Sequence, residues 1–124
     1  MTKILIVDDE KTIRELCQRI LIKHDYIVET AQHVTEALEI LDDTFDLVIS
    51  DYRMPGSTGV CLAEQIKNKF NGRIPVIIMT GTIDDIKLSR RESLGVSDFI
   101  LKPFNINEFL LKGSTIHKVK EMEI

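Results

Sequence analysis

The sequence predicts an α/β fold, in which a doubly wound parallel sheet of five strands carries helices on both faces. Strand-like and helix-like segments alternate along the chain in five successive pairs, as they do in folds built from β-α-β units. The first, third and fourth strand-like segments are continuously apolar, which is typical of parallel strands covered on both faces. Right-handed crossovers then place helices on the two sides of the sheet.

The first half of the chain contains three predicted strands and two predicted helices. Residues 3–8 form a continuous apolar strand, residues 26–30 a short alternating one, and residues 45–50 (FDLVIS) the third. Apolar residues recur about every 3.6 positions over residues 10–24. They predict a helix whose apolar face is Ile13, Leu16, Cys17, Ile20 and Leu21. A second helix is marked by Val34, Ala37, Leu38 and Leu41.

The second half repeats the pattern after a predicted turn-rich loop, RMPGSTG at residues 53–59. The helix that follows has its apolar positions at Val60, Leu62, Ala63, Ile66 and Phe70. Residues 74–79 form the fourth predicted strand and residues 98–101 the fifth. The helices predicted on either side of the fifth strand have their end signals at Thr82, Gly95, Asn105 and Glu108.

The composition predicts a single globular domain over residues 1–124. A content of 44% hydrophobic and 29% charged residues is ordinary for such a domain. The net charge of −4 gives no sign of the basic patch that nucleic-acid-binding proteins use. No apolar stretch approaches the roughly 20 residues that span a bilayer, and the first residues do not resemble a signal peptide. We therefore expect a cytoplasmic protein without nucleic-acid or membrane partners.

Cys17 and Cys61 both fall in predicted helices. They lack the CxxC spacing of zinc and redox sites, and no disulfide framework is expected. We interpret both as small core residues in a reducing compartment.

Chemically active side chains stand where the predicted strands end. In a doubly wound sheet, ligands bind beyond the carboxyl ends of the strands, where the strand order reverses. The side chains at these ends are expected to converge on one shallow pocket. They are Asp8 and Asp9 after the first strand, Asp51 after the third, Thr80 after the fourth and Lys102 after the fifth.

Three carboxylates in one pocket need a counter-charge, which a hard divalent cation supplies. Mg²⁺ prefers oxygen ligands and is commonly held by one or two carboxylates and a phosphate. Asp9 and Asp51 are predicted to ligate it directly, and Asp8 through water. The phosphate would be supplied by a reaction at the site itself, because an aspartate can act as a nucleophile and form an aspartyl-phosphate. The metal, Lys102 and Thr80 would then each hold one phosphoryl oxygen.

Each of these residues also has a plain structural explanation. Asp9 is a favoured helix N-cap, and Asp51 can open a turn. Lys102 alone suggests a solvated surface lysine, and Thr80 a strand residue. Taken singly these explanations are the commoner ones, but the five residues together favour a phosphoryl-transfer site. Glu10 is assigned to the first turn of the first helix, where an acid favours the positive end of the helix dipole.

Four stretches, ILIVDDE, DLVISDYRMPGSTG, PVIIMTG and DFILKPF, together resemble the receiver domain of two-component response regulators. They run from the start to residue 104, so the resemblance covers essentially the whole chain. It implies a (βα)5 flavodoxin-like fold with strand order 2-1-3-4-5. It also implies that Asp51 accepts a phosphoryl group from a sensor histidine kinase, a phosphotransfer protein or a small phosphodonor, with Mg²⁺ as cofactor.

The same resemblance assigns the other site residues. Thr80 and Lys102 act in catalysis, and the peptide bond before Pro103 is expected to be cis. Such a domain is not a turnover enzyme, but catalyses its own Mg²⁺-dependent phosphorylation and dephosphorylation. The implied metal ligands are Asp8, Asp9, Asp51 and the backbone carbonyl of Arg53.

The resemblance also implies a conformational switch. A new phosphoryl group adds up to about two negative charges. Thr80 is expected to move toward it, and Phe99, the switch aromatic, to fill the vacated space. The change would reach the surface of residues 82–112, including a helix over 83–94 with few apolar anchors. That surface would regulate a downstream protein or an output domain, and both a stand-alone regulator and an excised receiver fit the sequence.

Three other interpretations share parts of the pattern. A flavin-binding electron carrier needs a Gly/Ser/Thr-rich phosphate loop after the first strand, where this chain is acidic. A dehalogenase-type phosphatase needs a second acid two residues after Asp51, where this chain has Arg53. A receiver-like scaffold that works without phosphate would normally lack one of the five site residues, and all five are present.

Overall fold

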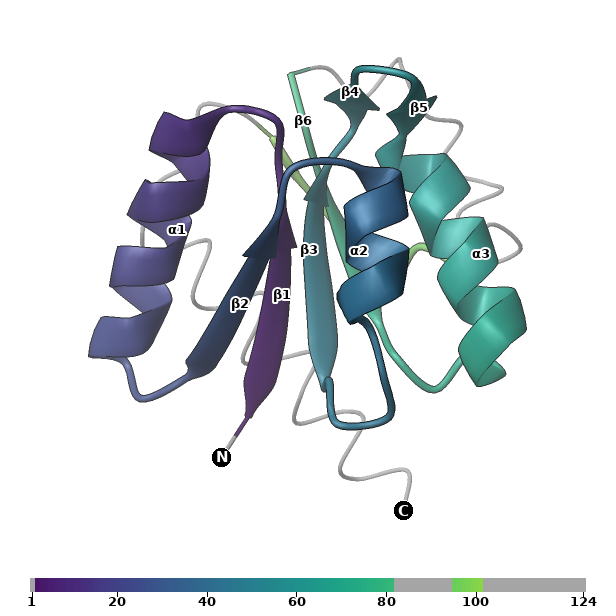
Figure 1. Cartoon of the computed structure of the whole chain (residues 1–124), viewed down its shortest axis with the longest axis horizontal. Coiled ribbons are helices and arrows are strands. Elements are labelled where there is room, and N and C mark those ends of the chain that lie inside the picture. Colours follow the sequence, from purple (N-terminus) through teal and green to yellow (C-terminus); the bar gives the residue numbers. More distant parts are fainter. Residues whose placement is uncertain (1, 82–94, 102–124) are drawn as a thin grey trace.

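A five-stranded parallel sheet runs through the centre of the chain (Figure 1). The computed structural model describes residues 2–81 and 95–101. In these residues the sheet has the order β2-β1-β3-β6-β7. Since β6 and β7 are the fourth and fifth predicted strands, the expected order 2-1-3-4-5 is confirmed. The strands are β1 (Lys3–Val7), β2 (Ile27–Ala31), β3 (Leu47–Asp51), β6 (Val76–Thr80) and β7 (Asp98–Leu101).

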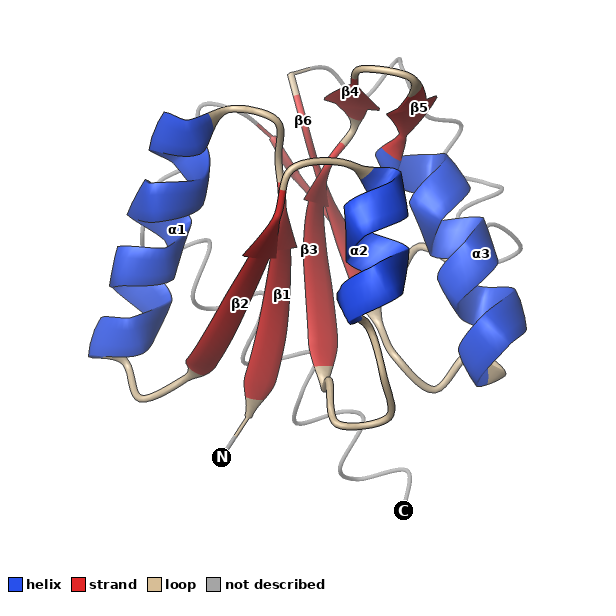
Figure 2. Cartoon of the chain, in the orientation of Figure 1, coloured by secondary structure: helices blue, strands red, loops and turns tan. Residues whose placement is uncertain are grey.

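Helices cover both faces of this sheet (Figure 2). One face carries α1 (Lys11–Lys23), and the other carries α2 (Val34–Ile40) and α3 (Gly59–Phe70). The helices expected over 83–94 and after Pro103 lie outside the described residues, as do Lys102 and Pro103 themselves.

Two apolar clusters fill the space between the sheet and the helices. Cys17, Ile20 and Leu21 of α1 pack on one face, against side chains such as Ile6 and Ile49. On the other face, α2 and α3 bury Val34, Ala37, Leu62, Ala63, Ile66 and Phe70 against the alternate strand residues. Because successive strand side chains point to opposite faces, a strand between two clusters must be apolar throughout. The central strands β3 and β6 are accordingly buried along their whole length.

Several details differ from the sequence predictions. Strand β2 begins one residue later than expected, and its outer position at the sheet edge leaves Ile27 exposed. Leu16 was expected on the apolar face of α1 but is 41% exposed, because the buried stripe is narrower than the 3.6-residue pattern suggested. Both cysteines are free, yet Cys61 is only half-buried and is not the core residue that the sequence suggested, whereas Cys17 is buried.

The stretch after Asp51 was predicted to be a loop, but it forms a small antiparallel hairpin. Strand β4 (Arg53–Met54) pairs with β5 (Ser57–Thr58) through Pro55 and Gly56. Gly56, in the turn between the two strands, has a φ of +83°. Glycine adopts this left-handed conformation without strain. Strands of two residues are too short to show an alternating pattern in the sequence, so the hairpin could not be recognised there. The hairpin lies at the same edge as the carboxyl ends of β1 and β3 (Figure 1).

Candidate metal centre

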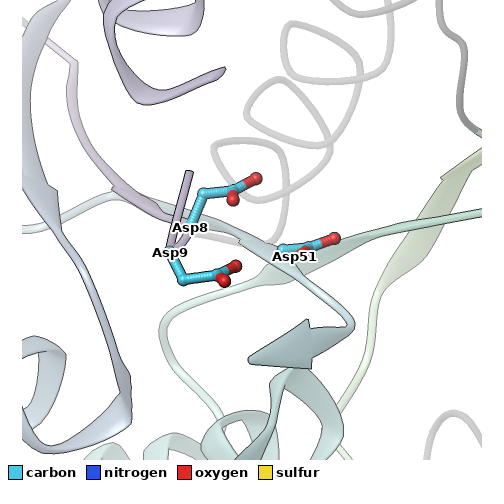
Figure 3. A group of neighbouring side chains, drawn as sticks. All are labelled: Asp8, Asp9 and Asp51. Atoms are coloured by element: carbon cyan, nitrogen blue, oxygen red, sulfur yellow. The ribbon is translucent and has the colours of Figure 1, made fainter. Parts of the chain in front are cut away.

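Three carboxylates meet at the carboxyl edge of the sheet (Figure 3). Asp8 and Asp9 follow β1 directly, and Asp51 is the last residue of the neighbouring strand β3. Each offers an oxygen, and these oxygens all lie within 4.8 Å of one another. Asp8 is fully buried and Asp51 is 8% exposed, whereas Asp9 is exposed. The arrangement brings together the three acids that the sequence suggested as metal ligands.

Asp8 is held through its backbone and its side chain. Its N–H donates to the carbonyl of Ala31 on β2 at 3.1 Å. Its Oδ1 accepts a hydrogen bond from the N–H of Glu10 at 2.9 Å, and its carbonyl accepts one from Nη1 of Arg14 at 2.7 Å. These bonds leave the loop between β1 and α1 little freedom.

The same loop corrects the interpretation of Glu10. This residue is the N-cap of α1, with an extended backbone (φ −90°, ψ 115°), so it precedes the first turn. Glu10 therefore lies one position earlier than the sequence suggested, at the N-cap, where an acid is still near the positive end of the helix dipole. Asp9 lies one residue before the cap, which also removes the alternative that Asp9 is only a helix cap.

Asp51 is positioned by its neighbours in sequence and by the start of α3. The hydroxyl of Ser50 donates to the carbonyl of Asp51 at 3.0 Å, and the N–H of Gly59 donates to the carbonyl of Tyr52 at 2.8 Å. Gly59 lies so close that a Cβ on it would overlap the Asp51 carbonyl oxygen and lie 3.1 Å from Oγ of Ser50. Only glycine allows this approach, so Gly59 sets where Asp51 stands.

Arg53 is an exposed residue of β4. Its guanidinium carbon lies 5.7 Å from the centre of the Tyr52 ring, an arrangement typical of a cation–π contact. Its backbone is held in the hairpin opposite Thr58. The carbonyl of Arg53, which the family resemblance implies as a ligand, belongs to this hairpin, two residues after Asp51.

Thr80 and Phe99 lie on neighbouring strands next to this site. Thr80 is the last residue of β6 and is 1% exposed. Phe99 of β7 stands opposite Ile78 and packs into the same apolar cluster. Because side chains alternate along a strand, Thr80 and Phe99 are on the same face of the sheet as Ile78.

The three acids make a donor set that suits a hard divalent cation. Carboxylates at these separations repel one another, and the burial of Asp8 and Asp51 weakens the screening by water. Mg²⁺ and Ca²⁺ both prefer oxygen ligands, and a site with only two or three carboxylates favours Mg²⁺, which keeps several of its waters. The residues therefore fit the metal that the sequence suggested.

None of the helices within residues 2–81 and 95–101 has the length and apolarity to cross a membrane.

Comparison with known families identifies this arrangement. The family model of the response regulator receiver domain matches residues 4–112. The chain belongs to this family. A receiver domain of two-component systems has the sheet order and helix arrangement described above, and the predicted family and fold are both confirmed.

Known relatives of this receiver domain include bacterial regulators of transcription. It is 34% identical over 112 residues to the transcriptional regulatory protein ResD of Bacillus subtilis, covering 90% of this chain and 46% of ResD. It is also 34% identical over 111 residues to the regulatory protein VanR of Enterococcus faecium, covering 89% of this chain and 47% of VanR. The receiver domain thus spans about half the length of the curated relatives that it matches.

Solved structures give the same assignment. A response regulator receiver domain protein from Clostridium thermocellum superposes with a TM-score of 0.90 at 28% identity, covering 100% of both chains. The response regulator TrrA from Thermotoga maritima, solved in complex with Mg²⁺-BeF, has a TM-score of 0.81 at 34% identity, covering 93% of this chain and 98% of TrrA.

Proposed function

We propose that this receiver domain is a phosphorylation-activated switch in which Asp51 accepts a phosphoryl group with the help of Mg²⁺. The observation that supports it best is the placement of Asp51 beside Asp8 and Asp9, with carboxylate oxygens within 4.8 Å at the carboxyl edge of the sheet. The Mg²⁺-BeF complex of the similar regulator TrrA supports the choice of metal.

In the proposed reaction, a carboxylate oxygen of Asp51 attacks the phosphorus atom of the donor. A P–O bond forms, and the bond to the leaving group breaks, which is a P–N bond when the donor is a phosphohistidine. Asp9, Asp51 and the Arg53 carbonyl would hold Mg²⁺ directly, and Asp8 would hold it through water. When bound, the ion supplies positive charge against the charge that develops on the phosphoryl oxygens. Thr80 and Lys102 would each bind one further phosphoryl oxygen.

The proposed biological setting follows from the family. The donor would be a sensor histidine kinase, a phosphotransfer protein or a small phosphodonor, and the reaction would take place in the cytoplasm. The protein would catalyse its own phosphorylation and dephosphorylation without turning over a separate substrate. Residues 1–124 would form one receiver domain, which signals to a downstream protein or to an attached output domain.

Incubation with acetyl phosphate and Mg²⁺ tests this function. The wild-type protein is expected to gain one phosphoryl group by intact-mass spectrometry, and the Asp51→Asn variant none. Asp25→Asn is a matched control, because Asp25 is exposed and has a left-handed φ of +68° that asparagine also adopts. The control should be labelled like the wild type, and EDTA should prevent labelling. Labelling of Asp51→Asn at the wild-type level would exclude the proposed site.

Phosphorylation would be read out through Thr80 and Phe99. The hydroxyl of Thr80 would move to donate a hydrogen bond to a phosphoryl oxygen, and the ring of Phe99 would follow into the vacated space. Both side chains are buried on one face of adjacent strands, so a shift of one changes the packing of the other. The affected output surface is proposed to be residues 82–112.

This switch is testable with beryllofluoride, which mimics a phosphoryl group. Adding it with Mg²⁺ is expected to shift the NMR resonances of Phe99 and of residues 81–112. Thr80→Val has nearly the same shape but lacks the hydroxyl, so it should bind beryllofluoride with much smaller shifts at Phe99. The switch would be wrong if residues 81–112 kept their resonances in the wild-type complex.

A further inference from the structure

Arg14 contacts the acidic loop from one turn inside α1. The N–H of Arg14 donates to the carbonyl of Glu10 at 3.1 Å, so Arg14 belongs to the first hydrogen-bonded turn of this helix. Helical side chains lean toward the helix N-terminus, which lets the guanidinium reach back over the loop. There Nη1 donates to the carbonyl of Asp8 at 2.7 Å in a partly buried position.

That carbonyl belongs to the peptide unit that joins the two acids. The amide nitrogen of the same unit is that of Asp9, so a rotation of this peptide would turn the Asp9 side chain away from Asp51. The N–H of Asp8 is bonded to Ala31 on β2, and its Oδ1 accepts from the N–H of Glu10 at the start of α1. Arg14 adds a side-chain bond from α1 to the carbonyl of this peptide.

The position of Arg14 runs against an ordinary preference of helices. Cations are disfavoured near a helix N-terminus, because the helix dipole is positive there. Yet the start of α1 has no acidic residue in its first turn and carries Lys11 and Arg14 instead. Lys11 forms an exposed ion pair with Glu15 at 3.8 Å, whereas Arg14 bonds the loop. A locally unfavourable residue with a specific contact at a site is commonly functional.

From these contacts we infer that Arg14 is a positioning residue for the metal centre: it fixes the Asp8–Asp9 peptide so that the Asp9 carboxylate faces Asp51. The inference rests on the proposed function, since it concerns the same Mg²⁺ site. It assigns Arg14 no contact with the metal or the phosphoryl group.

A positioning role and a purely electrostatic role of Arg14 predict opposite changes in Mg²⁺ affinity when Arg14 is replaced. If the positive charge of Arg14 only repelled Mg²⁺, its removal would tighten metal binding. If Arg14 positions Asp9, its removal weakens metal binding, although a repelling charge has gone. Residues that orient metal ligands typically change metal affinity by about 10–100-fold when they are replaced. Because Arg14 acts through one backbone carbonyl, we expect a loss near the lower end, about tenfold.

The test is a titration of the metal-free protein with Mg²⁺ alone, followed by NMR. Arg14→Met is expected to raise the Kd for Mg²⁺ about tenfold. Arg14→Lys, which keeps a charged donor, should recover part of the affinity and also serves if Arg14→Met folds poorly. Lys11→Met is the matched control: it removes a charge from the same turn without loosening the loop, so its Kd should stay the same or fall slightly. The Asp9 amide nitrogen, which shares a peptide with the Asp8 carbonyl, should shift in both Arg14 variants before any metal is added.

The outcomes distinguish a failure of the positioning role of Arg14 from a failure of the proposed Mg²⁺ site. Unchanged or tighter Mg²⁺ binding by Arg14→Met, with normal binding by the wild type, overturns the positioning role alone. So does an equal loss in Arg14→Met and Lys11→Met. Absence of Mg²⁺ binding by the wild-type protein overturns the proposed metal site, and the inference with it.

Discussion

Gly59→Ala is expected to destabilise the protein by about 2–3 kcal/mol, the upper part of the range for overpacked interiors. The added Cβ would overlap the Asp51 carbonyl oxygen and would lie 3.0 Å from Cδ1 of Ile78. The first of these neighbours is backbone, which cannot rotate away as the end of a side chain can. Either α3 or the end of β3 must therefore shift, and a shift of β3 moves Asp51 away from Asp8 and Asp9.

Urea unfolding measures the loss of stability, and titration with Mg²⁺ measures the displacement of Asp51. Gly81→Ala is the control for stability, because a Cβ on Gly81 would meet nothing within 4 Å and its φ is not in the positive range. We expect Gly81→Ala to change the free energy of unfolding by less than about 1 kcal/mol. Wild-type stability and Mg²⁺ affinity in Gly59→Ala would contradict the positioning of Asp51 by α3.

Asp9→Asn is expected to change stability in opposite directions with and without Mg²⁺. Without the metal, the variant removes one of three carboxylates whose oxygens lie within 4.8 Å, and relief of their repulsion should stabilise the protein by about 1 kcal/mol. With Mg²⁺ at 100 times the wild-type Kd, the wild type gains about 2.7 kcal/mol by linkage. The variant, which has lost a ligand, gains little, so the order of stability reverses.

Urea unfolding in EDTA and again in Mg²⁺ would show this reversal. Asp25→Asn again serves as control, since Asp25 is exposed and is not among the three clustered acids. Its stability should respond to Mg²⁺ as that of the wild type does. If Asp9→Asn were the less stable protein in EDTA, or if Mg²⁺ stabilised it fully, the three acids would not act as one metal site.

The fold could be predicted largely from the sequence, because the determining signals are local. The apolar runs ILIV and VIIM can be satisfied only by strands covered on both faces, and β1 and β6 are such strands. The acids at the strand ends were predictable for the same reason, since parallel strands bring their carboxyl ends to one edge. The narrow buried stripe of α1 was less predictable, because Leu16 fits the helical period and yet stays exposed.

What holds the acids in place could not be predicted from the pattern. Gly59 appeared only as the end of a turn-rich stretch, and its closeness to Asp51 depends on how α3 packs against β3. Arg14 lies outside the apolar positions of the helix predicted over residues 10–24, and its bond to the Asp8 carbonyl depends on where α1 begins. Each contact joins a helix to the end of a strand. Periodicity reports which side of an element is buried, but not which backbone group a side chain reaches.

Chemical mapping of the phosphorylated residue tests the phosphoacceptor assignment most directly. The wild-type protein is phosphorylated with acetyl phosphate and Mg²⁺ and then treated with borohydride, which reduces an acyl phosphate to an alcohol and so converts the modified aspartate to homoserine. Peptide mass spectrometry then locates that residue without any substitution in the protein. Phosphorylation of Asp51 predicts homoserine at position 51 alone. Homoserine at position 8 or 9, or no conversion at position 51, would contradict it.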